Sequence, residues 1–217
     1  MSANAEPAIA TGGMLKIAPL TDVNTYFGEL RRIIDRLPYR TVDDVAAAIV
    51  RAYHQGRTVF LFGNGGSAAL ASHMACDLGK GTAPPGQTAK RLRVLALTDN
   101  VPLITAWAND FRYDDIFAEQ LRNFVQPGDV AFAISGSGNS PNVMAGLQVA
   151  RQAGAFTVGL TGHEGGSMKA LCDLCLIVPA DNMQLIEDLH LCLAHAIFHT
   201  VRQSISSGKT MAVARAL

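Results

Sequence analysis

The stretch VFLFGNGGSAALASHMACD, from Val59 to Asp77, decides the fold of this chain. It begins as an apolar strand, breaks at the glycine-rich turn 63–67, and continues as an alanine-rich helix. A turn between a strand and a helix leaves backbone N–H groups free to bind an anion. The four-residue spacing of His73 and Asp77 places them on one helix face, where they could share a metal or a proton.

The same alternation of strand and helix continues along the chain. We expect strands at 58–62, 93–97, 130–134, 157–160 and 174–178, and helices at about 67–79, 101–108, 114–124, 141–152, 167–171 and 183–205. Each strand is a continuous apolar run, which is typical of a parallel sheet that is covered on both faces. The predicted fold class is therefore α/β, a three-layer α-β-α sandwich around a five-stranded parallel sheet.

Two additional helices are predicted before the first strand. Apolar residues recur at spacings of three and four at Tyr26, Leu30, Ile33, Ile34 and Leu37. Pro38 interrupts the pattern, Thr41 is the expected N-cap of a second helix, and Gly56 is its expected end. Residues 1–20, rich in Ala, Gly, Ser and Pro, are expected to form a flexible tail, and residues 21–217 a single domain.

Composition limits the function classes. The chain has 217 residues, 49% hydrophobic and 17% charged, with zero net charge at pH 7. No basic stripe favours nucleic acid or an anionic membrane as partner, and no apolar run is long enough to span a bilayer. The first residues lack the pattern of a signal peptide, so we expect a cytoplasmic protein with reduced thiols.

The four cysteines are Cys76, Cys172, Cys175 and Cys192. Cys172 and Cys175 form a C-x-x-C, which in some proteins is a redox or zinc pair. No second pair completes a zinc site, and the motif does not open a helix. We therefore expect the two thiols to be small packed side chains in the apolar run LCDLCLIV.

Small polar residues follow the predicted strands. Because the carboxyl ends of parallel strands meet at one edge of the sheet, these residues are expected to face a common site. The third loop, SGSGNS, precedes a helix that starts at Pro141, so free N–H groups, the helix dipole and serine hydroxyls can together bind a phosphate. The candidates are Asn64, Gly65, Gly66 and Ser67 after the first strand, Asp99 after the second, and Ser135, Gly136, Ser137, Asn139 and Ser140 after the third.

Two common nucleotide motifs do not match. The dinucleotide fingerprint G-x-G-x-x-G begins correctly at Gly63, but Ala68 occupies the third glycine position, and Asp99 is too far along for the ribose carboxylate. No Gly-Lys-Ser/Thr follows any of the turns, so the P-loop pattern is absent from the sequence. A phosphorylated small molecule is favoured over a nucleotide.

The motifs FGNGGSAA, ISGSGNSPNV and LTGHEGG resemble the sugar isomerase (SIS) domain. Within it, the chain is most similar to the phosphoheptose isomerases. The similarity continues through ANDFRYDDIFAEQL and the C-terminal IEDLHLCLAH. It covers about residues 22–205, with several separated motifs in the same order.

Spacing alone leaves the partners of His73 and Asp77 open, because Glu187 with His190, or His195 with His199, could form one face of the last helix. The resemblance implies a different set. It assigns catalysis to Asp77 and His195, and zinc or another divalent metal to His73, Asp77, Glu187 and His195. His190 is a secondary candidate, and Gln184 joins the substrate-binding residues.

The chain departs from the family pattern at three of these positions. The family usually has Glu at the position of Asp77, Gln at that of Glu187 and Asp at that of Gln184.

The resemblance implies an aldose–ketose isomerase that interconverts sedoheptulose 7-phosphate and D-glycero-D-manno-heptose 7-phosphate through an enediol, in heptose biosynthesis. It also implies a homotetramer with sites near subunit interfaces. Two alternatives stay open: an isomerase of another phosphorylated sugar, and a non-catalytic SIS protein that binds a sugar phosphate or a replication initiator. Relatives that resemble the initiator-binding protein lack the acid and the histidine found here at 77 and 195.

Overall fold

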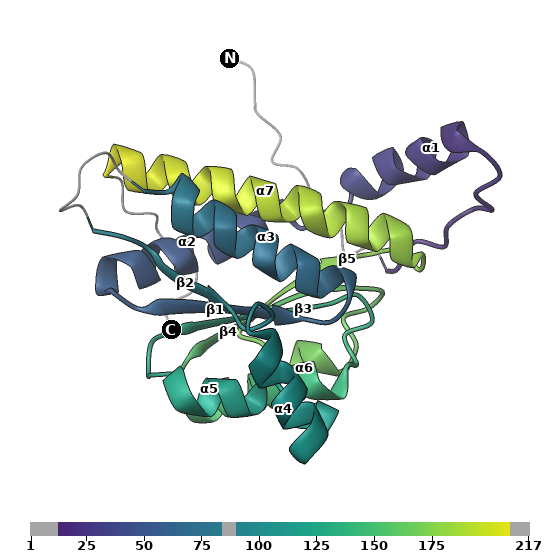
Figure 1. Cartoon of the computed structure of the whole chain (residues 1–217). Helices are drawn as coiled ribbons and strands as arrows, with labels where there is room; N and C mark the ends of the chain where they lie inside the picture. The colour runs from purple at the N-terminus through teal and green to yellow at the C-terminus, as the bar shows by residue number, and fades with distance from the viewer. Residues whose placement is uncertain (1–12, 84–89, 209–217) are drawn as a thin grey trace.

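The fold is described by a computed structural model of residues 13–83 and 90–208 (Figure 1). Five parallel strands form one sheet in the order β2-β1-β3-β4-β5. The strands are β1 (Thr58–Gly63), β2 (Arg93–Ala96), β3 (Val130–Ser135), β4 (Phe156–Gly162) and β5 (Leu174–Val178). The five predicted strands and their parallel pairing are confirmed.

Strand order explains where a ligand can bind. From β1 the chain continues to β2 on one side, while β3, β4 and β5 follow on the other side. Such a switch point opens a crevice at the carboxyl ends of β1 and β3. Both strands are almost wholly buried, and Gly63 at the end of β1 is paired with Ile134 next to the end of β3. The two polar loops that follow therefore start side by side.

Helices cover both faces of the sheet, as predicted (Figure 1). One layer contains α1 (Val23–Ile34), α2 (Tyr39–Gln55), α3 (Gly66–Gly81) and α7 (Met183–Ser207). The other contains α4 (Val101–Asp110), α5 (Ala118–Phe124) and α6 (Pro141–Gln152), with the 3₁₀ turns η1 (Tyr113–Asp115) and η2 (Ser167–Leu171). A separate hydrophobic core lies on each face of the sheet.

Two helix boundaries differ from the prediction. The second helix begins at Tyr39, directly after Pro38, so Thr41 lies inside it and is not its N-cap. Proline has a φ angle suited to a helix start and needs no N–H partner there. The helix expected at 114–124 is divided into η1 and α5, because the turn between them buries Ile116 and Phe117 in the second core.

The described part of the expected N-terminal tail packs against the domain. The backbone N–H of Leu15 donates to Pro179 O at 2.8 Å, and that of Ile17 donates to the Asp181 carboxylate at 3.0 Å. Leu15, Ile17 and Leu20 contact the first core. Residues 13–20 thus extend the domain, while residues 1–12 lie outside the described structure.

In the two described segments, none of the helices combines the length and the apolar character that a bilayer span requires.

Candidate active site

Helices α3 and α7 bring His73, Asp77 and His195 together. The two helices run in the same direction, since Gly66 at the start of α3 lies near Glu187 and Gly81 at its end lies against Phe198. His73 Nε2 and His195 Nε2 are 2.9 Å apart. Asp77 Oδ2 lies 3.4 Å from the first nitrogen and 3.7 Å from the second. The two imidazoles are about half exposed, so the group is open to a ligand.

This donor set fits a divalent cation. One ligand atom from each of the three residues lies within 4.8 Å of the others. Zinc holds nitrogen and oxygen ligands at about 2.0–2.2 Å in a tetrahedron, which needs neighbouring ligand atoms a few ångströms apart. Two imidazoles and one carboxylate on neighbouring helices meet that requirement, and a fourth position would be left for a substrate oxygen.

Glu187, the fourth residue expected at the metal, lies elsewhere. It precedes His195 by eight residues on α7, a rise of about 12 Å. Its carboxylate lies at the start of α3, where Oε1 is 3.4 Å from the position that a Cβ on Gly66 would occupy. Glu187 and His73 line the same cavity of about 380 Å³ between α3 and α7, but Glu187 is not part of the three-residue group.

His190, the secondary candidate, is buried in the wall of that cavity. Its side chain is 1% exposed, and its Nε2 has no hydrogen-bond partner among the described residues. Desolvation lowers the pKa of His190 to about 4, although a hydrogen bond with the Thr161 backbone acts in the opposite direction. The imidazole is therefore neutral at pH 7 and serves the packing of α7 on the sheet.

The loop after β3 forms a compact polar turn at the start of α6. Ser135 Oγ and Ser140 Oγ are 3.2 Å apart, and the helix begins at Pro141 without a side-chain cap. Gly138 has a φ of +66°, and a Cβ there would collide with Gly165 O and lie 2.8 Å from Thr161 Oγ1. Only glycine allows this close approach, which holds the turn against the loop after β4.

A second loop, after β4, supports this one. The backbone N–H of Ser167 donates to Asn139 Oδ1 at 2.9 Å, and that of Met168 donates to Gly138 O at 2.9 Å. Asn139 also donates from its side chain to Ser137 O at 3.0 Å. Asn139 thus organises the turn, which was not apparent from the sequence.

The remaining residues of the predicted site lie around the His–Asp group and the turn at 135–140. Ser67 is buried in the first turn of α3, and Gly65, just before that helix, has a φ of +55°. Gly136 lies against Met183 in the first turn of α7, next to the exposed Gln184.

Asn64 and Asp99 both have protein partners. The Asn64 and Asn142 amides exchange two hydrogen bonds of 2.8 Å, and the Tyr113 hydroxyl donates to Asn64 Oδ1 at 3.1 Å. Asp99 accepts a short hydrogen bond from Ser72. Sequence reasoning missed Asn142, Tyr113 and Ser72 as positioning residues, although the first two lie within the motifs that it singled out.

Comparisons with known proteins identify the family of this chain. The family model of the SIS domain matches residues 25–162. Curated phosphoheptose isomerases are similar to most of the chain: that of Pelobacter propionicus is 38% identical over 75% of this chain and 84% of its own length, and that of Paramagnetospirillum magneticum is 40% identical over 77% and 82%. The solved phosphoheptose isomerase of Neisseria gonorrhoeae is 30% identical, with a TM-score of 0.76 over 83% of this chain and 97% of that one.

The five-stranded parallel sheet, the serine-rich turn at its edge and the family match together define an SIS-domain protein. Within that class, the identity and coverage show that the chain belongs to the phosphoheptose isomerase family, whose members are aldose–ketose isomerases.

Proposed function

We propose that this chain interconverts sedoheptulose 7-phosphate and D-glycero-D-manno-heptose 7-phosphate. The observation that carries the proposal is the His73–Asp77–His195 group, in a chain of this family. An aldose–ketose isomerisation moves one proton between C1 and C2 through an enediol. It needs one group that takes the proton and another that protonates or polarises the oxygen. The His73–Asp77–His195 group contains a carboxylate and two imidazoles that can serve these roles.

The turn 135–140 binds the phosphate in this proposal. It offers serine hydroxyls and the positive end of the α6 helix dipole. The start of α3 is less suitable, because the Glu187 carboxylate lies beside Gly66 and repels a second anion. Ser67, Asn64, Asp99 and Gln184 are assigned to the sugar, and binding of the remote phosphate lowers the entropic cost of reaching the transition state.

Asp77 and His195 transfer the proton in this proposal. The carboxylate lies 3.7 Å from His195 Nε2, and His73 Nε2 lies 2.9 Å from that nitrogen. Before a cation binds, one of the two facing imidazole nitrogens carries a hydrogen that the other accepts, and a bound cation would take the place of this hydrogen.

Zinc, or another divalent cation, is the proposed cofactor, held by His73, Asp77 and His195. When bound, such a cation polarises a carbonyl and stabilises the negative charge that develops on its oxygen. Metal analysis of protein purified without chelator tests the assignment: we expect about one equivalent in the wild type and a large loss in His73→Ala. Less than a tenth of an equivalent in the wild type would contradict it.

The decisive experiment is a coupled assay across ketose phosphates of five to eight carbons, with and without added zinc. We expect sedoheptulose 7-phosphate to be the best substrate. Asp77→Asn and His195→Ala should each lower kcat by at least about 10²-fold with the fold intact. The exposed His54 on α2 provides the control, since His54→Ala should leave the rate unchanged. A near wild-type rate in either active-site variant would refute these roles.

The assay also separates the alternatives. An isomerase of another sugar phosphate would prefer a different chain length. A non-catalytic SIS protein would bind the phosphorylated sugar without turnover.

The proposed protein is cytoplasmic and homotetrameric. The half-exposed position of the His–Asp group on α3 and α7 is compatible with sites near subunit interfaces.

A further inference from the structure

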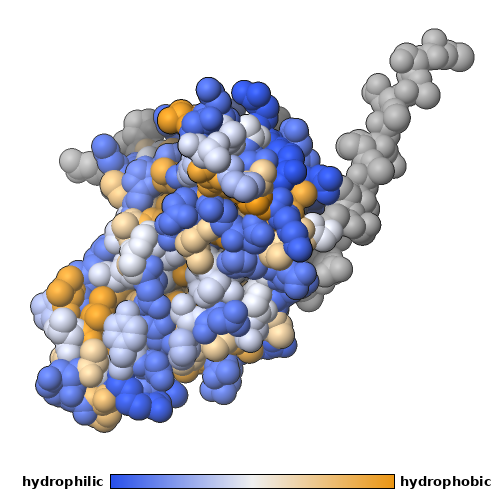
Figure 2. Space-filling model, turned by 90° about the vertical axis from the view of Figure 1, so that its right-hand side faces the viewer, coloured by the Kyte–Doolittle hydropathy of each residue, from blue (hydrophilic) through white to orange (hydrophobic). Residues whose placement is uncertain are grey.

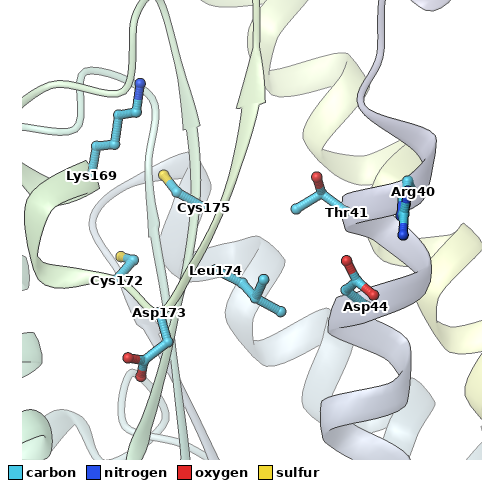
Figure 3. Close-up of a pocket in the computed structure, with 8 residues that line it drawn as sticks. All are labelled: Arg40, Thr41, Asp44, Lys169, Cys172, Asp173, Leu174 and Cys175. Atoms are coloured by element: carbon cyan, nitrogen blue, oxygen red, sulfur yellow. The ribbon is translucent and has the colours of Figure 1, made fainter. Parts of the chain in front are cut away.

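The C-x-x-C pair lies at a cavity on the edge of the sheet, away from the His–Asp group. A cavity of about 600 Å³ is lined by η2, the start of β5 and the first turns of α2. Figure 3 shows Cys172, Cys175 and Lys169 on one wall of this cavity, with Arg40, Thr41 and Asp44 on the other. Both thiols are half-buried at this edge, and Cys172 also packs against the second core.

The sulfur atoms of Cys172 and Cys175 both lie next to Gly159. Gly159 of β4 lies beneath them, and a Cβ at that position would be 2.7 Å from Cys172 Sγ and 3.4 Å from Cys175 Sγ. Both sulfur atoms thus lie close to one position on β4, and Cys172 Sγ also lies 3.3 Å from Met168 O. Two thiols that neighbour the same position can be joined by a disulfide after local movement.

The two thiols are not equivalent. The neighbouring Cys172 thiol has the largest effect on the pKa of Cys175 and lowers it; burial acts in the opposite direction, and the charge of Lys169 lowers it further. The same neighbour and burial raise the pKa of Cys172. Cys175 also lines a second cavity, which contains Arg36, so it is reached from two sides. Among the charged groups nearby, Asp173 is held by hydrogen bonds with Thr157. Cys175 is the nucleophile in such an environment, and Cys172 is the resolving thiol.

We propose that Cys172 and Cys175 form a redox-active dithiol that a small-molecule disulfide oxidises to an intramolecular disulfide. The Cys175 thiolate attacks one sulfur of the oxidant and releases one thiol. Cys172 then loses its proton and attacks Cys175 Sγ, which releases the second thiol. Two protein thiols become one disulfide, and the oxidant is reduced to two thiols.

A metal site is less well supported here. Structural zinc takes four ligands, and soft-metal sites need thiolates or imidazoles around both cysteines. Within the described residues, three metal-ligating side chains come together at His73, Asp77 and His195, and no such group surrounds the two thiols.

We expect oxidation of the two thiols to alter the phosphate-binding turn, because η2 connects Cys172 to that turn. Cys172 follows the last residue of η2, while the other end of η2 donates hydrogen bonds to Asn139 and Gly138 of the turn. A disulfide needs sulfur atoms about 2.05 Å apart, closer than two separate thiols can lie, so Cys172, Cys175 or both must move. We therefore expect a weaker phosphate turn in the oxidised protein, a consequence that rests on the proposed function.

The test uses the full chain with the two exposed cysteines replaced, Cys76→Ser/Cys192→Ser. After incubation with glutathione disulfide, we expect both remaining thiols to be lost, with one internal disulfide by peptide mapping and reversal by dithiothreitol. Adding Cys172→Ser should trap one glutathione on Cys175, whereas adding Cys175→Ser should leave Cys172 unmodified. Mapping of the wild-type chain gives the same readout if a variant does not fold.

Retention of both thiols in excess oxidant would overturn the proposal, and so would equal modification of the two single-cysteine variants.

KM for sedoheptulose 7-phosphate should rise roughly threefold or more on oxidation and recover on reduction. An unchanged KM in fully oxidised protein would overturn the link to the turn. Absence of turnover in reduced protein would refute the proposed function. The thiol measurements would still show whether Cys172 and Cys175 form a disulfide.

Discussion

At the scale of single residues, Asp77 shows how the site accommodates a shorter side chain. The family resemblance implies Glu at this position, and Asp is shorter by one methylene. The carboxylate nevertheless lies 3.4 Å from His73 Nε2, because the two residues are one helical turn apart on α3. It is also 3.7 Å from His195 Nε2 on α7. The close approach of α3 and α7 therefore offsets the lost length.

His190 provides a prediction about pH. Its pKa is about 4 in the folded protein, against 6.5 for an ordinary histidine, so the unfolded chain binds more protons between these two values. Stability should fall as pH is lowered from about 6.5 to 4, by on the order of 3 kcal/mol, and this contribution should not change further below pH 4. Urea titrations across this range measure it.

His190→Gln should flatten that decline, because the buried group no longer takes up a proton on unfolding. His54→Gln serves as the control, since His54 is exposed on α2 and its replacement should leave the slope unchanged. An unchanged slope in His190→Gln would show that another group causes the acid sensitivity.

At the scale of elements, the contact between the loops after β3 and β4 depends on glycine. Gly166 has a φ of +56°, and a Cβ there would lie 2.6 Å from both Ser137 O and Gly138 O. Backbone atoms cannot move aside as a flexible side chain can. The loop after β4 therefore fixes the shape of the phosphate-binding turn.

Gly166→Ala should lower the free energy of unfolding by about 1–3 kcal/mol and raise KM for the sugar phosphate. Gly28→Ala is the matched control: Gly28 lies inside α1 with open space around it, so alanine should raise stability by about 0.5–1 kcal/mol without affecting KM. Denaturation curves and kinetics of both variants test this pair. A wild-type KM in Gly166→Ala would show that phosphate binding does not depend on the contact between these two loops.

At the scale of the whole molecule, α1 projects from the domain (Figure 1). Two of its apolar side chains are largely exposed. Val23 is 69% and Phe27 57% exposed. The surface in Figure 2 is largely hydrophilic, with separate hydrophobic patches. On its inner side α1 is held by Tyr26, whose hydroxyl donates to Asp188 Oδ2 at 2.5 Å. Desolvation, helped by this carboxylate, raises the pKa of Tyr26 to about 12, so the hydroxyl keeps its proton.

Burial of this apolar side of α1 between subunits is consistent with the proposed homotetramer. Phe27→Glu should then shift the sedimentation coefficient to a smaller species, because a charge in an apolar interface is costly. Phe124→Glu is the control, since Phe124 is also about half exposed but lies on α5, on the opposite face of the sheet. A tetramer that persists in Phe27→Glu would place the interface elsewhere.

Local sequence patterns were sufficient to predict the strands, the parallel sheet and its two helical layers. Apolar runs bounded by glycine turns specify strands by themselves, and alternation with helices specifies parallel pairing. The same local reading identified the His73–Asp77 pair and the serine-rich turn, because each depends on residues close together in the chain.

Only the tertiary structure decided which distant side chains meet. His195 joins His73 and Asp77 because α7 packs alongside α3 in the same direction, whereas Glu187, two turns earlier, reaches the start of α3 instead. The two cysteines lie over Gly159 at the sheet edge because β4 and β5 pair there. Such contacts depend on the packing of whole elements, which spacing along one helix or strand does not encode.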